Sequence, residues 1–314
     1  MQSVRQGAIP LFRLAGVDVS LHWSWFLVAA YEIQSRKGDY STILWNVLEY
    51  LALFLIVLTH EFGHAMACRQ VGGTADKILL WPFGGVAYVD PPQRPGAMLW
   101  SIAAGPLVNV VLLPVLIGAV FAARAAGLPN TAPDLYRFVV AVAYINGSLL
   151  AFNILPIYPL DGGQILRSLL WFVMGRGRSL MVATILGVVG IVGLVTLAIW
   201  WRSLWLAAIS VYLLMSCWGG LKHARELLRI AKLPRRSGFA CPSCRTAPPI
   251  GSYWRCGACG QSFDMFESAA VCPHCKAVFT STICLDCGKS SPVKDWMVGA
   301  PAGTVVGGDG YAQN

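Results

Sequence analysis

Charged residues are scarce in this sequence. Asp, Glu, Lys and Arg make up 12% of the 314 residues, and 56% of the residues are hydrophobic. An ordinary soluble protein contains about 25% charged residues. This composition, with a mean hydropathy of +0.60, excludes an ordinary water-soluble domain and predicts a membrane protein. A cleaved signal peptide is not expected, because no small-residue cleavage site follows the first apolar run.

Acidic residues are scarcer than basic ones, and the net charge is +9. All of this surplus lies in residues 1–236, whereas residues 237–314 contain five basic and five acidic residues. An excess of basic residues in the segments that flank apolar runs is typical of membrane proteins, in which these residues determine the topology. Nothing in the neutral C-terminal part favours binding to a phosphate backbone, so no nucleic-acid partner is expected.

Cysteine is almost absent from the apolar part of the chain. Only Cys68 and Cys217 lie there, and we expect both to be small buried hydrophobic residues. The other eight of the ten cysteines lie between residues 241 and 287. The chain therefore combines an apolar region with a short cysteine-rich one.

One apolar run ends in a group of ionisable residues. Residues 51–58 are all apolar, and after Thr59 the chain continues as His60-Glu61-Phe-Gly-His64. On a helix, histidines four residues apart lie on one face and can bind one metal ion, while Glu61 can act as general base on a metal-bound water. Ionisable groups inside a bilayer are costly and usually functional. The alternative, two structural histidines bonded to neighbouring helices, is less favoured because it leaves Glu61 unexplained.

Six apolar segments are predicted to span the membrane as helices. They are residues 17–34, 41–69, 98–123, 135–155, 180–199 and 204–218. A further apolar segment, residues 78–89, is too short to cross a ~30 Å hydrocarbon core and is interrupted by Pro82, Gly84 and Gly85. We expect a re-entrant loop or β-hairpin beside the metal site, with a hairpin on the surface as the alternative.

The basic residues predict the orientation. With six spans, eight basic residues fall on the side of the N-terminus and five on the other side, and the basic stretch 222–236 adds to the first group. Basic residues favour the cytosolic side. Both termini are therefore expected in the cytosol, with the protein in the cell (plasma) membrane and the two histidines towards the cytosolic side.

Two histidines leave a catalytic zinc site one protein ligand short. Asp161 is the best candidate, because it follows the end of the fourth predicted span and so arrives at a similar depth. Two prolines end that span, and Gly162 and Gly163 are expected to free the backbone after the aspartate. The alternative is that Asp161 is the N-cap of a helix that begins near Gln164.

Together, these motifs resemble the site-2 protease family of intramembrane zinc metalloproteases. The resemblance rests on H-E-F-G-H at 60–64, Pro-Phe-Gly-Gly at 82–85, Ala-Gly-Pro at 104–106 and Asn-x-x-Pro-x-x-Pro-Leu-Asp-Gly-Gly at 153–163, and it covers roughly residues 10–215. It implies that His60, His64 and Asp161 bind a catalytic zinc ion and that Glu61 activates the water.

The resemblance also implies where a substrate binds. Asn153 matches a position thought to bind the substrate backbone or the oxyanion, and Phe83, Gly84 and Gly85 belong to the segment expected near the bound substrate. The implied activity is hydrolysis of a peptide bond in or near a transmembrane segment, often to release a regulator such as an anti-sigma factor or a membrane-bound transcription factor.

The eight clustered cysteines form four C-x-x-C pairs, which is the pattern of a double zinc ribbon. We expect consecutive pairs to share an ion, so that the first site is Cys241, Cys244, Cys256 and Cys259 and the second is Cys272, Cys275, Cys284 and Cys287. Disulfide pairing is the alternative, which a reducing cytosol disfavours. The expected zinc content is one catalytic and two structural ions.

The sequence thus predicts an α-helical polytopic membrane protein with a small cytosolic zinc-ribbon domain. We expect a protease domain over residues 1–219, a basic linker over 220–237, the ribbons over 238–290 and a disordered tail over 291–314. The expected partners are a transmembrane protein substrate, the lipid bilayer and a protein bound by the ribbons. The alternatives are a catalytically idle scaffold, for which Glu61 would have no use, and a metal transporter, which would need further ionisable residues in the other spans.

Overall fold

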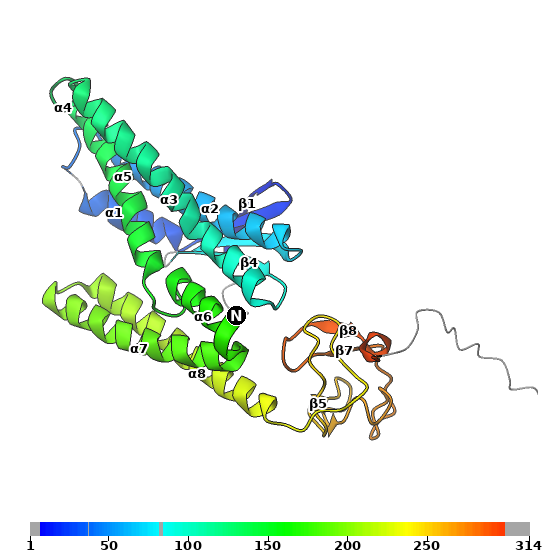
Figure 1. Ribbon diagram of the computed structural model, residues 1–314. Coiled ribbons are helices and arrows are strands. Elements are labelled where there is room, and N and C mark those ends of the chain that lie inside the picture. Colours follow the sequence, from blue (N-terminus) through cyan, green and yellow to red (C-terminus); the bar gives the residue numbers. More distant parts are fainter. Residues whose placement is uncertain (1–6, 37, 82–83, 299–314) are drawn as a thin grey trace, which may run out of the picture. The chain divides into compact units, whose positions relative to one another are not determined.

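The computed structural model describes residues 7–36, 38–81 and 84–298. The chain forms two compact units, Met1–Arg225 and Glu226–Asn314. The first unit combines a four-stranded sheet with the long apolar helices, and the second contains the cysteines of the C-x-x-C pairs (Figure 1). The two units are described separately below.

The sheet of the first unit has the order β1-β2-β3-β4, with β1 (Ala8–Leu14), β2 (Val17–His22), β3 (Thr74–Trp81) and β4 (Gly84–Asp90). Strands β2 and β3 are parallel, and the other two pairs are antiparallel. The tight turn between β1 and β2 consists of Ala15 and Gly16, which both have positive φ. Such a two-residue turn matches the right-handed twist of a hairpin.

The segment predicted as the first span, residues 17–34, is not a membrane helix. It consists of β2 followed by the 11-residue helix α1 (Trp25–Ser35). A helix of this length extends only about 16 Å, too short for a ~30 Å hydrocarbon core. The prediction was wrong because an apolar strand followed by a short apolar helix has the composition of one long apolar helix.

The β2–α1 segment nevertheless runs antiparallel to helix α2 (Ile43–Gln70) along the length of that helix. Near the end of α2, the Arg69 guanidinium donates to the carbonyl oxygens of Ala15 and Gly16. Near its start, Asn46 Nδ2 donates to the Arg36 carbonyl oxygen at 3.0 Å. The chain before α2 therefore passes from one end of that helix to the other without forming one continuous helix.

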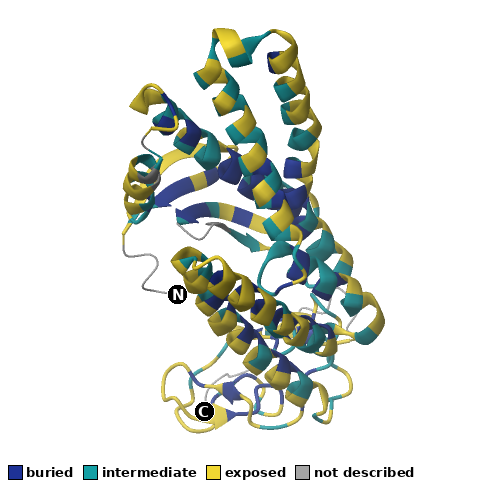
Figure 2. Ribbon diagram, turned by 90° about the vertical axis from the view of Figure 1, so that its left-hand side faces the viewer, coloured by how far each residue is buried: buried dark blue, intermediate teal, exposed yellow. Residues whose placement is uncertain are grey.

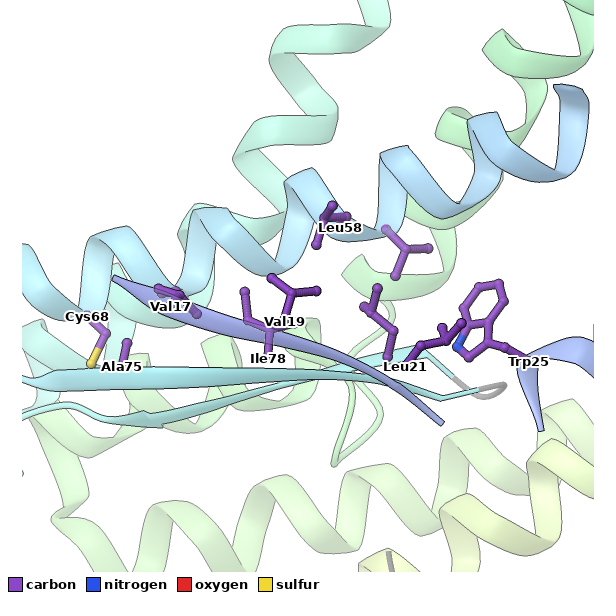
Figure 3. Close-up of a cluster of buried hydrophobic side chains, with 11 residues drawn as sticks. Val17, Val19, Leu21, Trp25, Leu58, Cys68, Ala75 and Ile78 are labelled. Carbon is purple, nitrogen blue, oxygen red and sulfur yellow. The ribbon is translucent and has the colours of Figure 1, made fainter. Parts of the chain in front are cut away.

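Apolar side chains join the sheet to α2. Alternate residues of β2 point towards the helix, and Val17, Val19 and Leu21 are all buried there with Leu58 and Cys68 of α2 (Figure 3). The buried face of the strand, formed by every second residue, thus packs against the buried face of the helix in one core. This core fixes the sheet against the helix that carries both histidines.

Five helices are long and apolar enough to cross a membrane. They are α2, α3 (Pro95–Ala125), α5 (Pro133–Ile154), α7 (Arg176–Trp200) and α8 (Leu204–Ala231). Their large apolar residues are widely exposed, as with Phe121 and Val189, which a lipid surrounding explains (Figure 2). The shorter helices are α4 (Leu128–Thr131) and α6 (Asp161–Met174). The polytopic α-helical fold expected from the sequence is confirmed, and so is the hairpin at residues 78–89, which is β3–β4.

The second unit has little regular structure. It contains the two-stranded sheets β5 (Trp254–Arg255) with β6 (Ser262–Phe263) and β7 (Ser281–Ile283) with β8 (Ser290–Pro292), followed by the 3-10 helix η2 (Val293–Trp296). Its core is formed by cysteines and by aromatic residues such as Trp254, Phe266 and Trp296. So small an apolar core is typical of domains that need bound metal to fold.

The boundaries of this unit differ from those expected. Helix α8 continues to Ala231, so the first part of the expected basic linker is helical. At the other end, the Val298 N–H donates to the Gly238 carbonyl oxygen at 3.0 Å, and Trp296 is buried. The folded module therefore extends beyond the expected end at residue 290. Residues 299–314 lie outside the described residues.

Candidate metal centres

The two histidines of α2 and the aspartate of α6 bring three ligand atoms together. His60 Nε2 lies 3.1 Å from His64 Nε2, and Asp161 Oδ2 lies 3.0 Å from the first and 3.4 Å from the second. A tetrahedral zinc ion with ligand distances of ~2.0–2.1 Å separates its ligand atoms by about 3.4 Å. The triangle of ligand atoms therefore has nearly the size that a zinc ion requires.

Two buried asparagines fix the protonation of His60. The Asn146 amide must donate to the Asn109 carbonyl oxygen, at 3.1 Å, so its own Oδ1 accepts from Asn109 Nδ2, at 2.8 Å. Asn109 Oδ1 is then left to accept a hydrogen bond from His60 Nδ1, at 2.6 Å. Because Nδ1 carries the proton, Nε2 of the neutral ring presents a lone pair to the centre of the site.

His64 is held in the same tautomer by the backbone. Its Nδ1 donates to the Ser101 carbonyl oxygen at 2.9 Å, so Nε2 is the ring nitrogen that faces the centre of the site. Two imidazole nitrogens and the carboxylate of Asp161 thus converge within 3.4 Å of one another. Two imidazoles and one carboxylate are a usual ligand set of catalytic zinc, so the donor set fits a metal ion such as zinc.

Glu61 is buried beside these ligands and is oriented by the sheet. Its Oε2 accepts a hydrogen bond of 3.0 Å from the backbone N–H of Ala87 on β4. Ala87 is paired with Ile78 of β3, and its N–H points away from that strand, since it donates to Glu61 instead. The free edge of β4 therefore faces the carboxylate that follows the first histidine.

Glycines allow the helices to approach the site closely. A Cβ atom at Gly105, in the Ala-Gly-Pro motif of α3, would collide with the imidazole rings of His60 and His64. A Cβ at Gly162 would collide with the Ile154 carbonyl group, and one at Gly163 with the backbone of residues 157 and 158. Each position therefore requires glycine for packing reasons.

This corrects the role that the sequence suggested for Gly162 and Gly163. Both lie inside α6, which begins at Asp161, and neither has a positive φ. They let α6 pack against the segment before it and do not free the backbone. The N-cap residue is Leu160, and no side chain caps the helix, so the alternative role of Asp161 as N-cap is excluded.

The expected substrate-binding residues lie at three places. Asn153 is in the last turn of α5 and half-buried, and its side chain has no hydrogen-bonding partner among the residues that the structure describes. Gly84 and Gly85 begin β4 and pair with Trp81 and Leu80 of β3. Phe83 lies outside the described residues.

The cysteines form two four-sulfur clusters, but not the expected ones. One cluster contains the first and last pairs along the chain, which we call the outer pairs: Cys241, Cys244, Cys284 and Cys287. The other contains the two middle pairs, called the inner pairs: Cys256, Cys259, Cys272 and Cys275. The prediction that consecutive pairs share an ion was wrong, because the inner pairs fold back on each other and bring the outer pairs together around them.

Sulfur distances in both clusters agree with zinc–thiolate geometry. Cys241 Sγ lies 3.7 Å from Cys287 Sγ in the outer cluster, and Cys256 Sγ lies 3.6 Å from Cys275 Sγ in the inner one. Sulfur atoms around a tetrahedral ion at ~2.3 Å are about 3.8 Å apart. The ten cysteines all lie within the described residues and form no disulfide, so the alternative of disulfide pairing does not apply. Cys68 and Cys217 are buried in the first unit, as expected.

Two acidic residues connect the end of the basic stretch to the cysteine-rich module. Arg235 forms a two-pronged ion pair with Asp286, and Arg236 Nη2 lies 2.7 Å from Asp264 Oδ2. Burial raises the pKa of Asp264, but backbone N–H donors from Gly251 and neighbouring residues, together with Arg236, hold it below its ordinary value. No sequence pattern predicts these pairs.

The comparisons with known proteins agree with this site. The model of peptidase family M50 matches residues 49–132 and 128–197, which include both histidines and Asp161. A zinc metalloprotease of Methanocaldococcus jannaschii is 33% identical over 184 residues, which cover 57% of this chain and 50% of that protein. Stage IV sporulation protein FB of Bacillus subtilis is 36% identical over 118 residues, covering 37% of this chain and 38% of that one. The chain thus spans half the length or less of these curated relatives.

Among solved structures, the site-2 protease from Methanocaldococcus jannaschii is similar to this chain. The sequence identity is 26% and the TM-score 0.49, and the match covers 68% of this chain and 95% of that one.

Proposed function

We propose that this chain, whose residues 49–197 match the model of peptidase family M50, is a site-2-type zinc-dependent endopeptidase that hydrolyses a peptide bond in or near a transmembrane segment of another protein. The observation that carries this proposal is the convergence of three ligand atoms, from His60, His64 and Asp161, beside Glu61. The C-terminal module is a zinc-ribbon unit by its two four-cysteine clusters.

The residues of the membrane site have different roles in the proposed hydrolysis. Zinc bound by the three ligands would lower the pKa of a water molecule to near 7 and polarise the scissile carbonyl group. Glu61 accepts a proton from the attacking water and returns it to the leaving nitrogen. The Ala87 N–H keeps the Glu61 carboxylate oriented for both transfers. Asn109 and the Ser101 carbonyl keep the imidazoles in the ligating tautomer.

A substrate must be extended to be cut, because in a lipid-embedded helix every amide is bonded within the helix. The free edge of β4, with Gly84 and Gly85 at its start, is suited to pair with an unwound substrate segment as an added strand. Asn153 then binds the substrate backbone or the oxyanion from the end of α5. These substrate roles, including that of Phe83, rest on the family resemblance together with the position of β4.

The ribbons complete the proposed assembly. We assign one zinc ion to the membrane site and one to each cysteine cluster, and we assign to the ribbon module the binding of a protein partner that recruits or regulates the protease. The chain is an integral membrane protein, and we place it in the plasma membrane with both termini in the cytosol. The β2–α1 segment, which runs the length of α2, preserves this topology without a helical first span.

A cleavage assay tests the proposal. The purified full-length chain is reconstituted with a panel of single-span membrane proteins, beside its Glu61→Gln variant and a Phe62→Leu variant as a control for substitutions next to the motif. Cleavage of a panel member by the wild type and the control, but not by Glu61→Gln, supports the protease. Equal cleavage by Glu61→Gln contradicts the role of Glu61, and binding without cleavage by every variant favours the idle scaffold.

A further inference from the structure

A buried arginine in the middle of α6, which leads into α7, has no counter-ion among the residues that the structure describes. Arg167 of α6 is 9% exposed, and its Nε atom is buried without a hydrogen-bonding partner. No acidic residue of the described chain lies within ion-pair distance of its guanidinium group. An uncompensated buried charge is strongly destabilising, so a binding partner for this cation is expected.

Further positive charges surround Arg167. The guanidinium carbons of Arg167 and of Arg176, the first residue of α7, lie 6.0 and 5.9 Å from the ring centroid of the same side chain, Trp171. The sequences of α6, α7 and α8 contain only two carboxylates, Asp161 at the metal site and Glu226. The cluster is therefore cationic, and Arg167 is its member for which the described residues provide no counter-ion.

The backbone at the corner between α6 and α7 also favours an anion. Helix α7 is 25 residues long and begins at Arg176, so its first N–H groups and the positive end of its dipole lie beside the two guanidinium groups. Arginine presents several N–H donors in a planar fork, which matches the oxygens of a phosphate. A phosphate group has more acceptor oxygens than a single carboxylate, so it can accept hydrogen bonds from two arginines and from backbone N–H groups at the same time.

The position of the corner identifies the source of that phosphate. Helix α7 is one of the five apolar helices, so its first residue lies where a membrane span begins. Next to the cationic cluster, Phe172 is 59% exposed and Val173 is 86% exposed. Exposed apolar side chains beside a cationic cluster at the end of a span lie at the depth where lipid headgroups meet acyl chains.

We propose that Arg167, Arg176 and the N-terminus of α7 form a binding site for the phosphate of an anionic phospholipid. The headgroup phosphate neutralises Arg167, while Phe172 and Val173 contact the acyl chains. The site is separate from the three zinc ligands, although α6 connects it to Asp161, two turns earlier on the same helix. Bound lipid thus stabilises the helix that presents the aspartate.

The test measures lipid binding to the full-length protein in a neutral detergent. Phosphatidylglycerol, phosphatidylcholine and inorganic phosphate are titrated separately, with retained lipid counted by native mass spectrometry and thermal unfolding followed in parallel. The variants are Arg167→Gln and Arg167→Lys, with Arg124→Gln as the matched control, because Arg124 is an exposed arginine at the end of α3. Removal of one charge-assisted contact should weaken binding about tenfold or more.

Three results support the site: preferential binding of phosphatidylglycerol, loss of that preference in Arg167→Gln, and its retention in Arg124→Gln. The Arg167→Lys variant keeps the charge, so it should fold even if Arg167→Gln does not, with weakened binding because the fork is lost. Equal binding of phosphatidylcholine, unchanged binding in both Arg167 variants, or the same stabilisation by inorganic phosphate alone would each overturn the lipid site.

Discussion

The backbone N–H of Ala87 donates a 3.0 Å hydrogen bond to Glu61 Oε2. This contact joins an edge strand of the sheet to the carboxylate that follows the first histidine. Because the same edge of β4 is the one suited to receive an extended substrate, the strand that would hold the substrate also orients the proposed general base. Substrate position and proton transfer are thereby set by one element.

Replacing Ala87 by proline should lower the rate of cleavage while leaving the metal site loaded. Proline removes the N–H that orients Glu61, and a strand edge tolerates the missing donor because it pairs with no other strand there. Loss of an oriented base costs about 100-fold in kcat. The matched variant Ala87→Gly keeps the N–H and should remain active. A fully active Ala87→Pro variant would show that Glu61 does not depend on the sheet.

Replacing Gly105 by alanine should remove the metal from the membrane site. The added methyl group occupies the space of the His64 and His60 rings, so the ligand triangle cannot form. Gly118→Ala on the same helix is the control, because a Cβ there meets nothing within 4 Å. Metal analysis should find one zinc ion fewer in Gly105→Ala than in Gly118→Ala, and equal contents would contradict the packing of α3 against the histidines.

Replacing Asn109 by leucine should weaken zinc binding at the membrane site by about 10–100-fold, since partners of ligating histidines contribute affinity of this order. The substitution frees His60 to rotate or to change tautomer. Thr196→Val serves as the control, because it removes a polar group from an exposed position of α7. Competition with a chelator gives the affinities, and an unchanged value for Asn109→Leu would remove that residue from the support of the site.

The nested arrangement of the cysteines is tested by zinc content. Changing all four cysteines of the outer pairs to serine should leave the inner site intact and remove one ion. Changing the first two pairs along the chain should disturb both clusters and remove both ions. Consecutive pairing predicts the opposite: the first variant would lose both ions and the second only one.

Much of the site could be predicted from the sequence, because its ligands belong to short motifs whose spacing is informative by itself. Histidines four apart share a helix face, so His60 and His64 needed no tertiary information, and Asp161 followed from the order of the spans. The supporting roles of Asn109 and Asn146 could not be predicted in this way. Their pairing depends on how α3 packs against α5, which no local pattern encodes.

Other features depended on three-dimensional pairing and were missed. Strand β2 and helix α1 together have the composition of one membrane helix, and the hydrogen bonds of β2 to β1 and β3 distinguish them from it. The glycines after Asp161 suggested backbone freedom, whereas close helix packing requires them. The spacing of the four C-x-x-C pairs identifies the ligands but not which pairs meet, because that depends on how the intervening chain folds back.

The most direct test of the account is the zinc content of the full-length protein, measured for the wild type, Glu61→Gln and Asp161→Ala. Three ions per chain are expected in the wild type, one for each ligand group. Glu61→Gln should keep all three, because Glu61 is no ligand, and Asp161→Ala should keep only the two ribbon ions. Two ions in the wild type, or three in Asp161→Ala, would contradict a catalytic zinc site formed by His60, His64 and Asp161.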